Sequence, residues 1–446
     1  MKIRSLLLGS VAAAGLSTGA FAADLGVLTS LDVCDALGLS GLTISSDTNC
    51  LQITGEVKYN FNWGDYTDNG DSAVFVDTEA DGGLDLLPVG NGYNDWSSKF
   101  SAWIKFVATA DSDFGPAKAV LKLKQKDYKL VTDAGYYGSS AYDTSTGSSS
   151  GGVYMDEAYV SIGDSTVIMA GKKGSIMKKG DDEPLNWLGL FNSEDVDSGV
   201  SWGPDVSIGD GGHVIQITSD LGNGVSVGAG LENLNGSTAS EAGTAVGYIA
   251  YAGEGISAHV TVAAAGVLDG TVEDWGVHAG FAGTFDNFKV VLAGAYGHDD
   301  VMSRDYWNVL ASASATFDMF TIAASFEAVQ NDGNDTDYGA GASIAATVSD
   351  GVTLNLGGRW YHEGTSGDDS YQIAASVAAA VTESVTLTGE IGYLNNDDGE
   401  DAMYGSAKLA WAPGGGYTSS VKGTVSSANW GDLGYKIETE FKKTFE

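Results

Sequence analysis

Histidine is the side chain best suited to acid–base chemistry near neutral pH, and the five histidines of this chain are scattered. Only two of them, on what alternation predicts to be the same polar face of adjacent strands, come near to forming a pair. Neither shares a motif with a serine or a carboxylate, whereas a hydrolase needs a nucleophile, a base and an orienting group within hydrogen-bond reach. The pattern predicts no catalytic residue and no enzyme, and a hydrolase built on that pair is the alternative. The histidines are His213, His259, His278, His298 and His362, and the pair is His259 and His278.

Metal and cofactor motifs are also weak. The run from Asp77 to Gly82 begins like a calcium loop, but its twelfth position is Pro88 where a glutamate is needed. Cys34 and Cys50 have no histidine near them and do not make a zinc site. We expect no metal site and no cofactor, apart from divalent cations held loosely by acidic loops.

Charge excludes another class of function. The 446 residues include 22 Lys+Arg against 59 Asp+Glu, a formal net charge of −37. Nucleic-acid binding is driven by clustered basic charge, so no nucleic-acid partner is expected.

The first 22 residues have the features of a secretory signal. Lys2 and Arg4 precede a short apolar stretch, and Ala20-Phe21-Ala22 forms a small-x-small cleavage site. Cleavage between Ala22 and Ala23 leaves 20 basic and 59 acidic residues, a net charge of −39. In the oxidising compartment beyond the inner membrane, Cys34 and Cys50 are expected to form one disulfide that clips residues 23–50; two free buried thiols are the alternative.

From residue 51 onward, apolar and polar residues alternate, which predicts strands with one apolar face and one polar, solvated face. Tight-turn signals recur about every 32 residues, so each repeat holds two strands, one tight turn and one longer polar loop. Each strand segment is about ten residues long, the length of a tilted strand that crosses a bilayer. The turn signals centre near Gly222, Glu254, Asp286, Asp318, Asp350, Glu383 and Pro413, with earlier ones near Gly115 and Asp164.

Nine tight turns imply ten hairpins and twenty strands. The predicted fold is all-β: a transmembrane antiparallel up-and-down β-barrel of 16–20 strands over residues 51–446, twenty by direct count. A barrel this wide encloses water. A soluble repetitive β protein, such as a solenoid or propeller, is the alternative.

Basic charge is concentrated in the first half of the predicted barrel. If the apolar strand faces touch lipid, lysines of the early strands line one wall of the lumen. The predicted basic pore wall consists of Lys58, Lys105, Lys122, Lys124 and Lys126. Lysines on the solvated face of an ordinary sheet would share this geometry.

Residues 174–199 form a long irregular stretch with an apolar centre, which is unusual for an external loop. We expect it to fold into the lumen as a constriction loop, with Trp187, Leu190 and Phe191 on the inner wall. Opposed charges across a narrowed aperture order water and filter ions. A loop folded over the barrel mouth is the alternative. The predicted acidic constriction consists of Asp181, Asp182, Glu183, Glu194, Asp195 and Asp197.

Over its first 200 residues the chain resembles the porins of alphaproteobacteria, the rhizobial-type family. The resemblance rests on Val33-Cys34-Asp35-Ala36-x-Gly38, on the run from Thr48 to Val57, and on the run from Asp156 to Gly163 followed by Ala170-Gly171-Lys172. It implies a homotrimer of sixteen-stranded barrels in the outer membrane of a Gram-negative alphaproteobacterium. It also implies a passive diffusion channel, a third loop that forms the constriction, and a disulfide between the two cysteines.

The sequence therefore leads us to expect an outer-membrane porin that passes small hydrophilic solutes and ions, with a preference for cations because of its negative charge. Outer-membrane lipid and lipopolysaccharide, a homotrimer and the solutes themselves are the expected partners. The alternative function is that of a secreted or surface-attached acidic repetitive β protein, an adhesin or envelope-layer component that binds divalent cations.

Overall fold

The computed structural model describes residues 31–65, 73–77, 85–89, 95–132, 135–137, 152–177, 184–188, 211–236, 243–300, 303–330, 335–396, 400–428 and 433–446. The predicted signal sequence and its cleavage site at Ala22 and Ala23 lie outside these residues.

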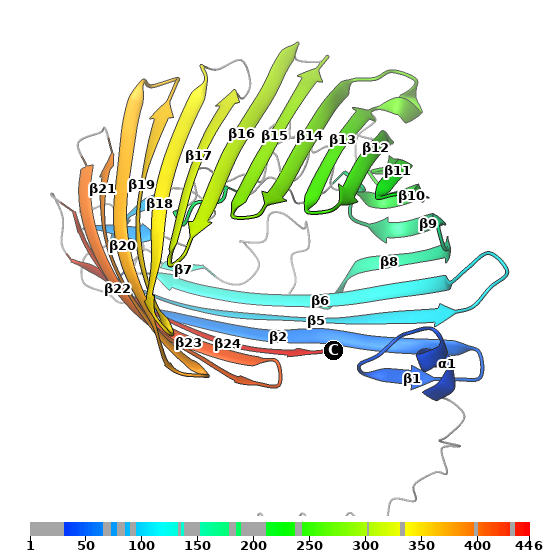
Figure 1. The fold of residues 1–446 in the computed structure, drawn as a ribbon, viewed down its shortest axis with the longest axis horizontal. Coiled ribbons are helices and arrows are strands. Elements are labelled where there is room, and N and C mark those ends of the chain that lie inside the picture. The colour runs from blue at the N-terminus through cyan, green and yellow to red at the C-terminus, as the bar shows by residue number, and fades with distance from the viewer. Residues whose placement is uncertain are drawn as a thin grey trace, which may run out of the picture.

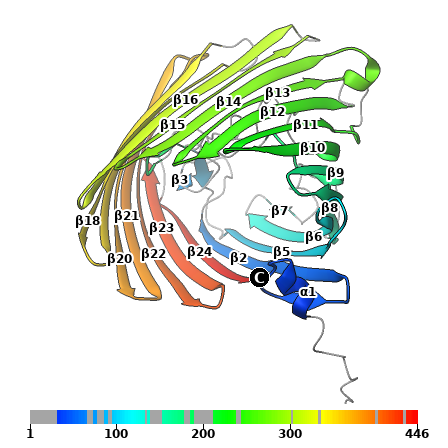
Figure 2. The same ribbon diagram turned by 45° about the vertical axis from the view of Figure 1, so that its right-hand side comes forward.

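The described residues form one closed antiparallel β-barrel (Figures 1 and 2). The main sheet has 22 strands, of which two three-residue strands are additions, so that twenty form the ring. Each ring strand pairs with the next, and the last pairs with the first from Gly55↔Phe445 to Asp65↔Tyr435. The ring strands are β2 (Asn49–Asp65), β5 (Asp95–Ala110), β6 (Ala117–Thr132), β8 (Tyr154–Gly163), β9 (Thr166–Lys173), β10 (Gly212–Gly222), β11 (Val225–Glu232), β12 (Thr244–Gly253), β13 (Ile256–Ala265), β14 (Asp274–Phe285), β15 (Phe288–Asp299), β16 (Arg304–Phe317), β17 (Phe320–Gln330), β18 (Asp337–Ser349), β19 (Val352–Glu363), β20 (Asp368–Thr382), β21 (Val385–Asn396), β22 (Glu400–Gly414), β23 (Tyr417–Ala428) and β24 (Gly434–Phe445).

Several short elements lie outside the twenty-stranded ring. Helix α1 (Leu31–Ala36) and β1 (Thr43–Ser45) precede β2, and β7 (Gly135–Tyr137) extends the pairing of β6. A 3-10 turn, η2 (Val267–Asp269), follows β13. A separate hairpin of β3 (Ala73–Asp77) and β4 (Asp85–Val89) lies next to β22–β24. Within the described residues, no helix is long and apolar enough to cross a membrane.

The predicted tight turns are confirmed, and local backbone chemistry explains them. Between β10 and β11, Asn223 and Gly224 have φ of 54° and 79°; between β12 and β13, Glu254 and Gly255 have φ of 50° and 79°. Positive φ at both central residues is what a two-residue hairpin turn needs if it is to follow the right-handed twist of the strands. The strand count of twenty is confirmed as well, so the sixteen strands that the family resemblance implied are wrong for this chain.

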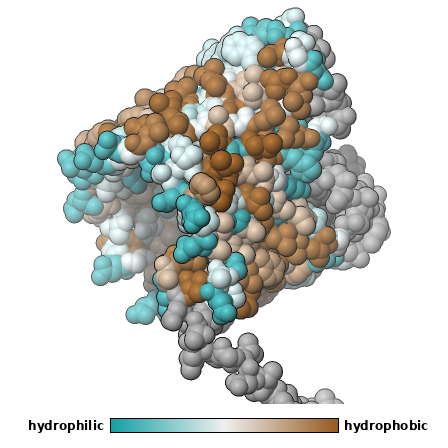
Figure 3. Space-filling view, turned by 90° about the vertical axis from the view of Figure 1, so that its right-hand side faces the viewer, coloured by the Kyte–Doolittle hydropathy of each residue, from teal (hydrophilic) through white to brown (hydrophobic). Residues whose placement is uncertain are grey.

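The outer face of the ring is apolar. Val260 on β13, Ile373 on β20 and Ile391 on β21 are 44%, 58% and 68% exposed, while the alternate residues point into the barrel. Figure 3 shows the resulting hydrophobic surface over the outside of the strands. Phe288 and Phe317 stack edge to face beside the short turns, with ring centroids 5.8 Å apart. This exposed belt on a closed ring contradicts the alternative of a soluble repetitive β protein, because such an area would be left in water.

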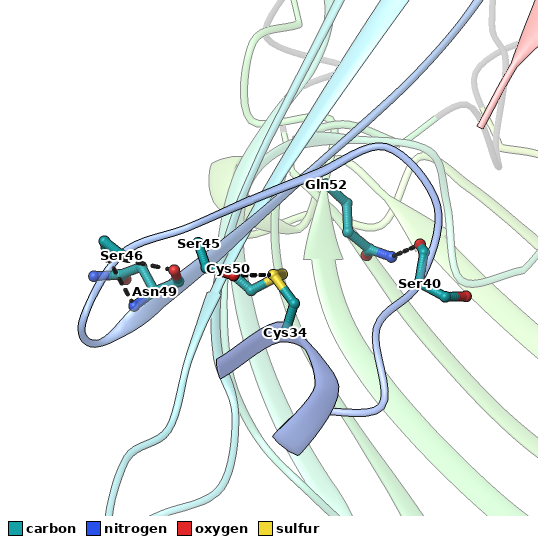
Figure 4. The surroundings of a disulfide bond; sticks show 7 residues. All are labelled: Cys34, Ser40, Ser45, Ser46, Asn49, Cys50 and Gln52. Atoms are coloured by element: carbon teal, nitrogen blue, oxygen red, sulfur yellow. Dashed lines mark hydrogen bonds between the residues drawn. A yellow bond between two sulfur atoms is a disulfide. The ribbon is translucent and has the colours of Figure 1, made fainter. Parts of the chain in front are cut away.

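The N-terminal segment is fastened to the start of β2. Cys34 on α1 and Cys50 on β2 form a disulfide, which confirms the predicted pairing (Figure 4). Ser45 donates a hydrogen bond of 2.8 Å to the sulfur of Cys34, and the Gln52 amide donates one of 3.1 Å to the Ser40 carbonyl. In the chain-entropy description, a loop of this size contributes about 3 kcal/mol.

Candidate functional site: the barrel lumen

The lumen has a basic wall where the first and last strands of the ring, β2 and β24, pair with each other. The inward faces of β2, β5, β6 and β22–β24 enclose a cavity of about 700 Å³, referred to here as the seam cavity. Its lining includes two glutamates, Glu438 and Glu440, several amide and hydroxyl side chains, and six lysines. The lysines are Lys58, Lys99, Lys126, Lys408, Lys422 and Lys436. Six lysines against two glutamates leave four positive charges in excess, in a chain whose net charge is −37.

Only part of this charge is neutralised within the cavity. Lys58 forms an ion pair with Glu440 at 2.6 Å, and Lys436 forms one with Glu438 at 2.8 Å. The Asn60 amide donates a hydrogen bond of 3.2 Å to the same Glu440 carboxylate. Both glutamates are thus engaged by lysines of their own wall.

A second lysine cluster lies beside the first and is compensated. Lys105 on β5 is 3.0 Å from Glu157 on β8. On β6, Lys122 and Lys124 are each 2.9 Å from Asp156. These partly exposed pairs are worth up to about 1 kcal/mol each. These pairs matter more for the electrostatics of the lumen than for stability, because they neutralise the positive charge of this section of wall.

A bulge makes this compensation possible. Asp156 and Glu157 are consecutive, so a regular strand would point them to opposite faces. The pairing of β6 with β8 shifts register between Lys122 and Leu123, which leaves Asp156 as the extra residue. A bulge of this kind re-aims a side chain, and here it turns both carboxylates toward the lysines in the lumen.

The far wall carries buried acidic groups. In the order of the ring, β15 lies opposite β2 (Figure 1). Inward-facing carboxylates on this side include Glu232 on β11, Asp274 on β14, Asp299 on β15 and Glu327 on β17. Among the described residues, carboxylates therefore predominate on the far wall, which also carries the partly buried Arg359 on β19, and lysines predominate on the seam wall.

The segment between β9 and β10 begins on this acidic wall. The backbone N–H of Ile176 donates to the Glu232 carboxylate at 3.0 Å, and the Gln216 amide donates to the Gly174 carbonyl at 3.3 Å. Met177 is fully buried in an apolar cluster that includes Val246.

Residues 184–188 lie further along the same wall. The Leu185 N–H donates to the Ser312 hydroxyl on β16 at 2.7 Å, and the Trp187 N–H donates to the Ser343 hydroxyl on β18 at 3.0 Å. Trp187 and Leu188 pack against a buried cluster on β20–β22, which consists of Ala374, Leu394, Ala402 and Tyr404. A Cβ at Gly357 on β19 would come within 3.1 Å of Leu188, so this glycine leaves room for the segment.

The sequence-predicted site residues divide into three groups. Lys58 and Lys126 line the seam cavity, whereas Lys105, Lys122 and Lys124 are held by β8. The predicted acidic constriction residues lie outside the described residues, as do Leu190 and Phe191; they are Asp181, Asp182, Glu183, Glu194, Asp195 and Asp197.

Sequence reasoning missed most of the seam cavity. Lys99, Lys408, Lys422 and Lys436 line this cavity and are not among the predicted pore-wall residues. The usable signal was the alternation of the last strands combined with barrel closure, which brings β22–β24 beside β2.

The histidine pair sits where alternation predicted. His259 and His278 face inward from adjacent strands, with Nε2 and Nδ1 3.4 Å apart. Within the described ranges, no group of three or more His, Cys, Asp or Glu side chains is arranged to hold a metal ion.

Comparison with known proteins adds a family. The model of a family described as the porin subfamily matches residues 30–413. Porin Omp2b of Brucella neotomae is 26% identical over 349 residues, which cover 72% of this chain and 84% of the relative. Porin Omp2a of Brucella ovis is 26% identical over 344 residues, covering 72% and 89%.

Solved structures are more distant. The anion-selective porin from Comamonas acidovorans is 13% identical, with a TM-score of 0.40 over 89% of this chain and 100% of that one. OccK11 (OpdR) of Pseudomonas aeruginosa is 10% identical, with a TM-score of 0.44 over 89% and 96%.

Proposed function

We propose, from the premise that this chain belongs to the porin subfamily and is an outer-membrane channel, that small hydrophilic solutes and ions diffuse passively through its lumen and that cations pass more readily than anions. The chain is not an enzyme.

The observation that carries this proposal is the separation of charge across the lumen. A ring of twenty strands is too wide for side chains to fill, so its interior holds water. Lysines on the β2 side face carboxylates on the β11–β17 side, and opposed charges across an aqueous gap create a transverse field. Small charged and polar solutes can cross such a lumen because its walls supply donors and acceptors in place of water.

Cation preference follows from the larger-scale charge. The net charge of −37 is the sum over the whole chain, so the average potential attracts cations. The compensated lysines on β5 and β6 reduce the opposing local effect. Four excess positive charges in the seam cavity work against cation passage only along their own wall.

We further propose that residues 174–199 narrow the lumen. The contacts of Ile176, Leu185 and Trp187 with the acidic wall support a path inside the barrel. In this arrangement the acidic residues from Asp181 to Asp197 face the lysines across the remaining aperture.

Planar-bilayer recordings test the proposed selectivity directly. The purified protein should give stable channels, and in a KCl gradient the reversal potential should lie toward the potassium equilibrium potential. A reversal potential on the chloride side would contradict cation preference and leave the channel in place. An absence of conductance from folded, heat-modifiable protein would contradict passive diffusion itself.

Family membership also supports a homotrimer surrounded by lipopolysaccharide. Mild-detergent extraction followed by size determination should give three protomers. A monomer under conditions that preserve the barrel would contradict this assembly.

A further inference from the structure

The seam cavity carries an excess of positive charge, unlike the neighbouring walls that the structure describes. Its lysines come from β2, β5, β6 and β22–β24, which are brought together only by ring closure. Lys58 and Lys436 are ion-paired with the two cavity glutamates. No ion pair within the described part of the chain involves Lys99, Lys126 or Lys408.

The strand register adds repulsion to this excess. Lys408 on β22 lies directly opposite Lys422 on β23, and Lys58 on β2 lies directly opposite Lys442 on β24. Like charges in directly opposed positions destabilise a sheet. Carboxylates lie beside the second pair, because Lys58 is 2.6 Å from Glu440 and Lys442 is 3.9 Å from Glu56. Lys422 also lies opposite Glu438 on β24, so an anion in the cavity would relieve repulsion chiefly at Lys408.

The neighbouring lysine cluster provides an internal comparison. Lys105 and Lys122 are also directly opposed, but the Glu157 carboxylate lies 3.0 Å from one and 3.6 Å from the other. Protein carboxylates thus compensate one pair of opposed lysines, whereas Lys408 has no ion-pair partner among the described residues. The seam cavity leaves positive charge available to a solute.

The cavity lining also limits the kind of solute. Lysine ammonium groups only donate hydrogen bonds, and the Asn60, Asn62 and Ser97 side chains add further donors. A volume of about 700 Å³ lies within the usual range for small-molecule sites. Several ammonium groups spread over six strands match a solute whose negative charges are spread over more than one group.

We propose that the seam cavity is a saturable binding site for small solutes that carry several phosphate or carboxylate groups. This inference rests on the proposed channel function and deepens it. The site holds a polyanion transiently on the basic wall, in a channel whose overall charge would otherwise exclude it.

Inorganic tripolyphosphate is a suitable probe, because it is compact and multiply charged. Single-channel potassium current should be recorded at about 0.1 M salt, where the Debye length is about 10 Å. Tripolyphosphate should interrupt the current with a half-blocking concentration and a plateau. Orthophosphate at matched ionic strength should block more weakly.

Matched variants separate a local site from the general potential. The double variant Lys99→Gln/Lys126→Gln removes two cavity lysines that have no ion-pair partner in the described chain. The control Lys118→Gln/Lys289→Gln removes the same charge from positions outside the cavity, one of them on the same strand as Lys126. The first should raise the half-blocking concentration about tenfold, equivalent to about 1.4 kcal/mol, and the control less than twofold.

The outcomes distinguish this inference from the proposed channel. A conducting channel that shows no saturable block overturns the binding site and leaves diffusion standing. Equal weakening in both double variants also overturns it, because the effect would then be one of overall charge. Failure of the wild-type protein to conduct would instead count against the channel.

Discussion

Two serine hydroxyls on the inner wall hold residues 184–188, and removing them should release this segment. Ser343 accepts a hydrogen bond from the Trp187 N–H, and Ser312 accepts one from the Leu185 N–H. Each such bond contributes about 1 kcal/mol net. Ser343→Ala should therefore raise the population of the released segment about fivefold, and Ser312→Ala/Ser343→Ala about thirtyfold.

Asn186 provides a reporter at the centre of the segment. It is 8% exposed, and neither polar atom of its side chain has a hydrogen-bond partner within the described chain. Asn186→Cys therefore breaks no described hydrogen bond and places a thiol at a buried position. The two native cysteines are joined in a disulfide, which leaves the new thiol as the one that labels. Its labelling rate by a water-soluble maleimide follows the released population when reclosing is fast.

The serine positions offer a matched control. Ser314→Ala/Ser406→Ala removes two inward-facing hydroxyls that make no described contact with the segment. Labelling in this control should stay within about twofold of the parent, because no anchoring bond is lost. If the thiol labels equally fast in the parent, the anchor variants and the control, with all four folded by heat modifiability, these hydrogen bonds do not hold the segment.

Three further changes test other parts of the structure. Ile391→Lys places a charge on the lipid-facing belt and should cost about 2–4 kcal/mol in urea unfolding from bilayers, whereas Thr388→Lys on the inward face of the same strand should cost about 1 kcal/mol or less. Equal costs would contradict the assignment of the two faces. Asp156→Asn/Glu157→Gln frees three lysines and should move the reversal potential in a KCl gradient toward chloride; no movement would mean that this section of wall is not exposed to permeating ions. Cys50→Ser should lower the free energy of unfolding by about 3 kcal/mol, and an unchanged urea midpoint would show that the N-terminal clip does not contribute to barrel stability.

Features set by neighbouring residues were predictable from the sequence. Alternation identified the lipid-facing and lumen-facing positions because a strand has a period of two, whatever its surroundings. Turns such as Asn223-Gly224 were predictable because positive φ restricts which residues can occupy them. Twenty strands followed from counting those turns, and the count was a better guide than the family resemblance.

Features set by distant parts of the chain were not predictable. Lys99 and Lys408 share a cavity because ring closure places β22–β24 beside β2; closure is part of the predicted fold, but the register that brings these two lysines to the same level is not encoded locally. Asp156 faces the lumen only because of a bulge, whereas strict alternation would send it to the lipid side. The Ser312 and Ser343 anchors are ordinary wall residues until the β9–β10 segment is placed against them.

The pairing of β2 with β24 has a consequence for how the barrel assembles. It joins positions as far apart as Asn60 and Glu440, which are 380 residues apart, whereas every other neighbour in the ring follows along the chain. Loop-closure entropy makes such a contact slow to form, so hairpins are expected to precede it. Until the two strands meet, the sheet has two open edges, and each unpaired backbone group in hydrocarbon costs several kcal/mol. Insertion of β24 therefore closes this barrel, and a chain truncated before Gly434 would lack the strand that pairs with both β2 and β23.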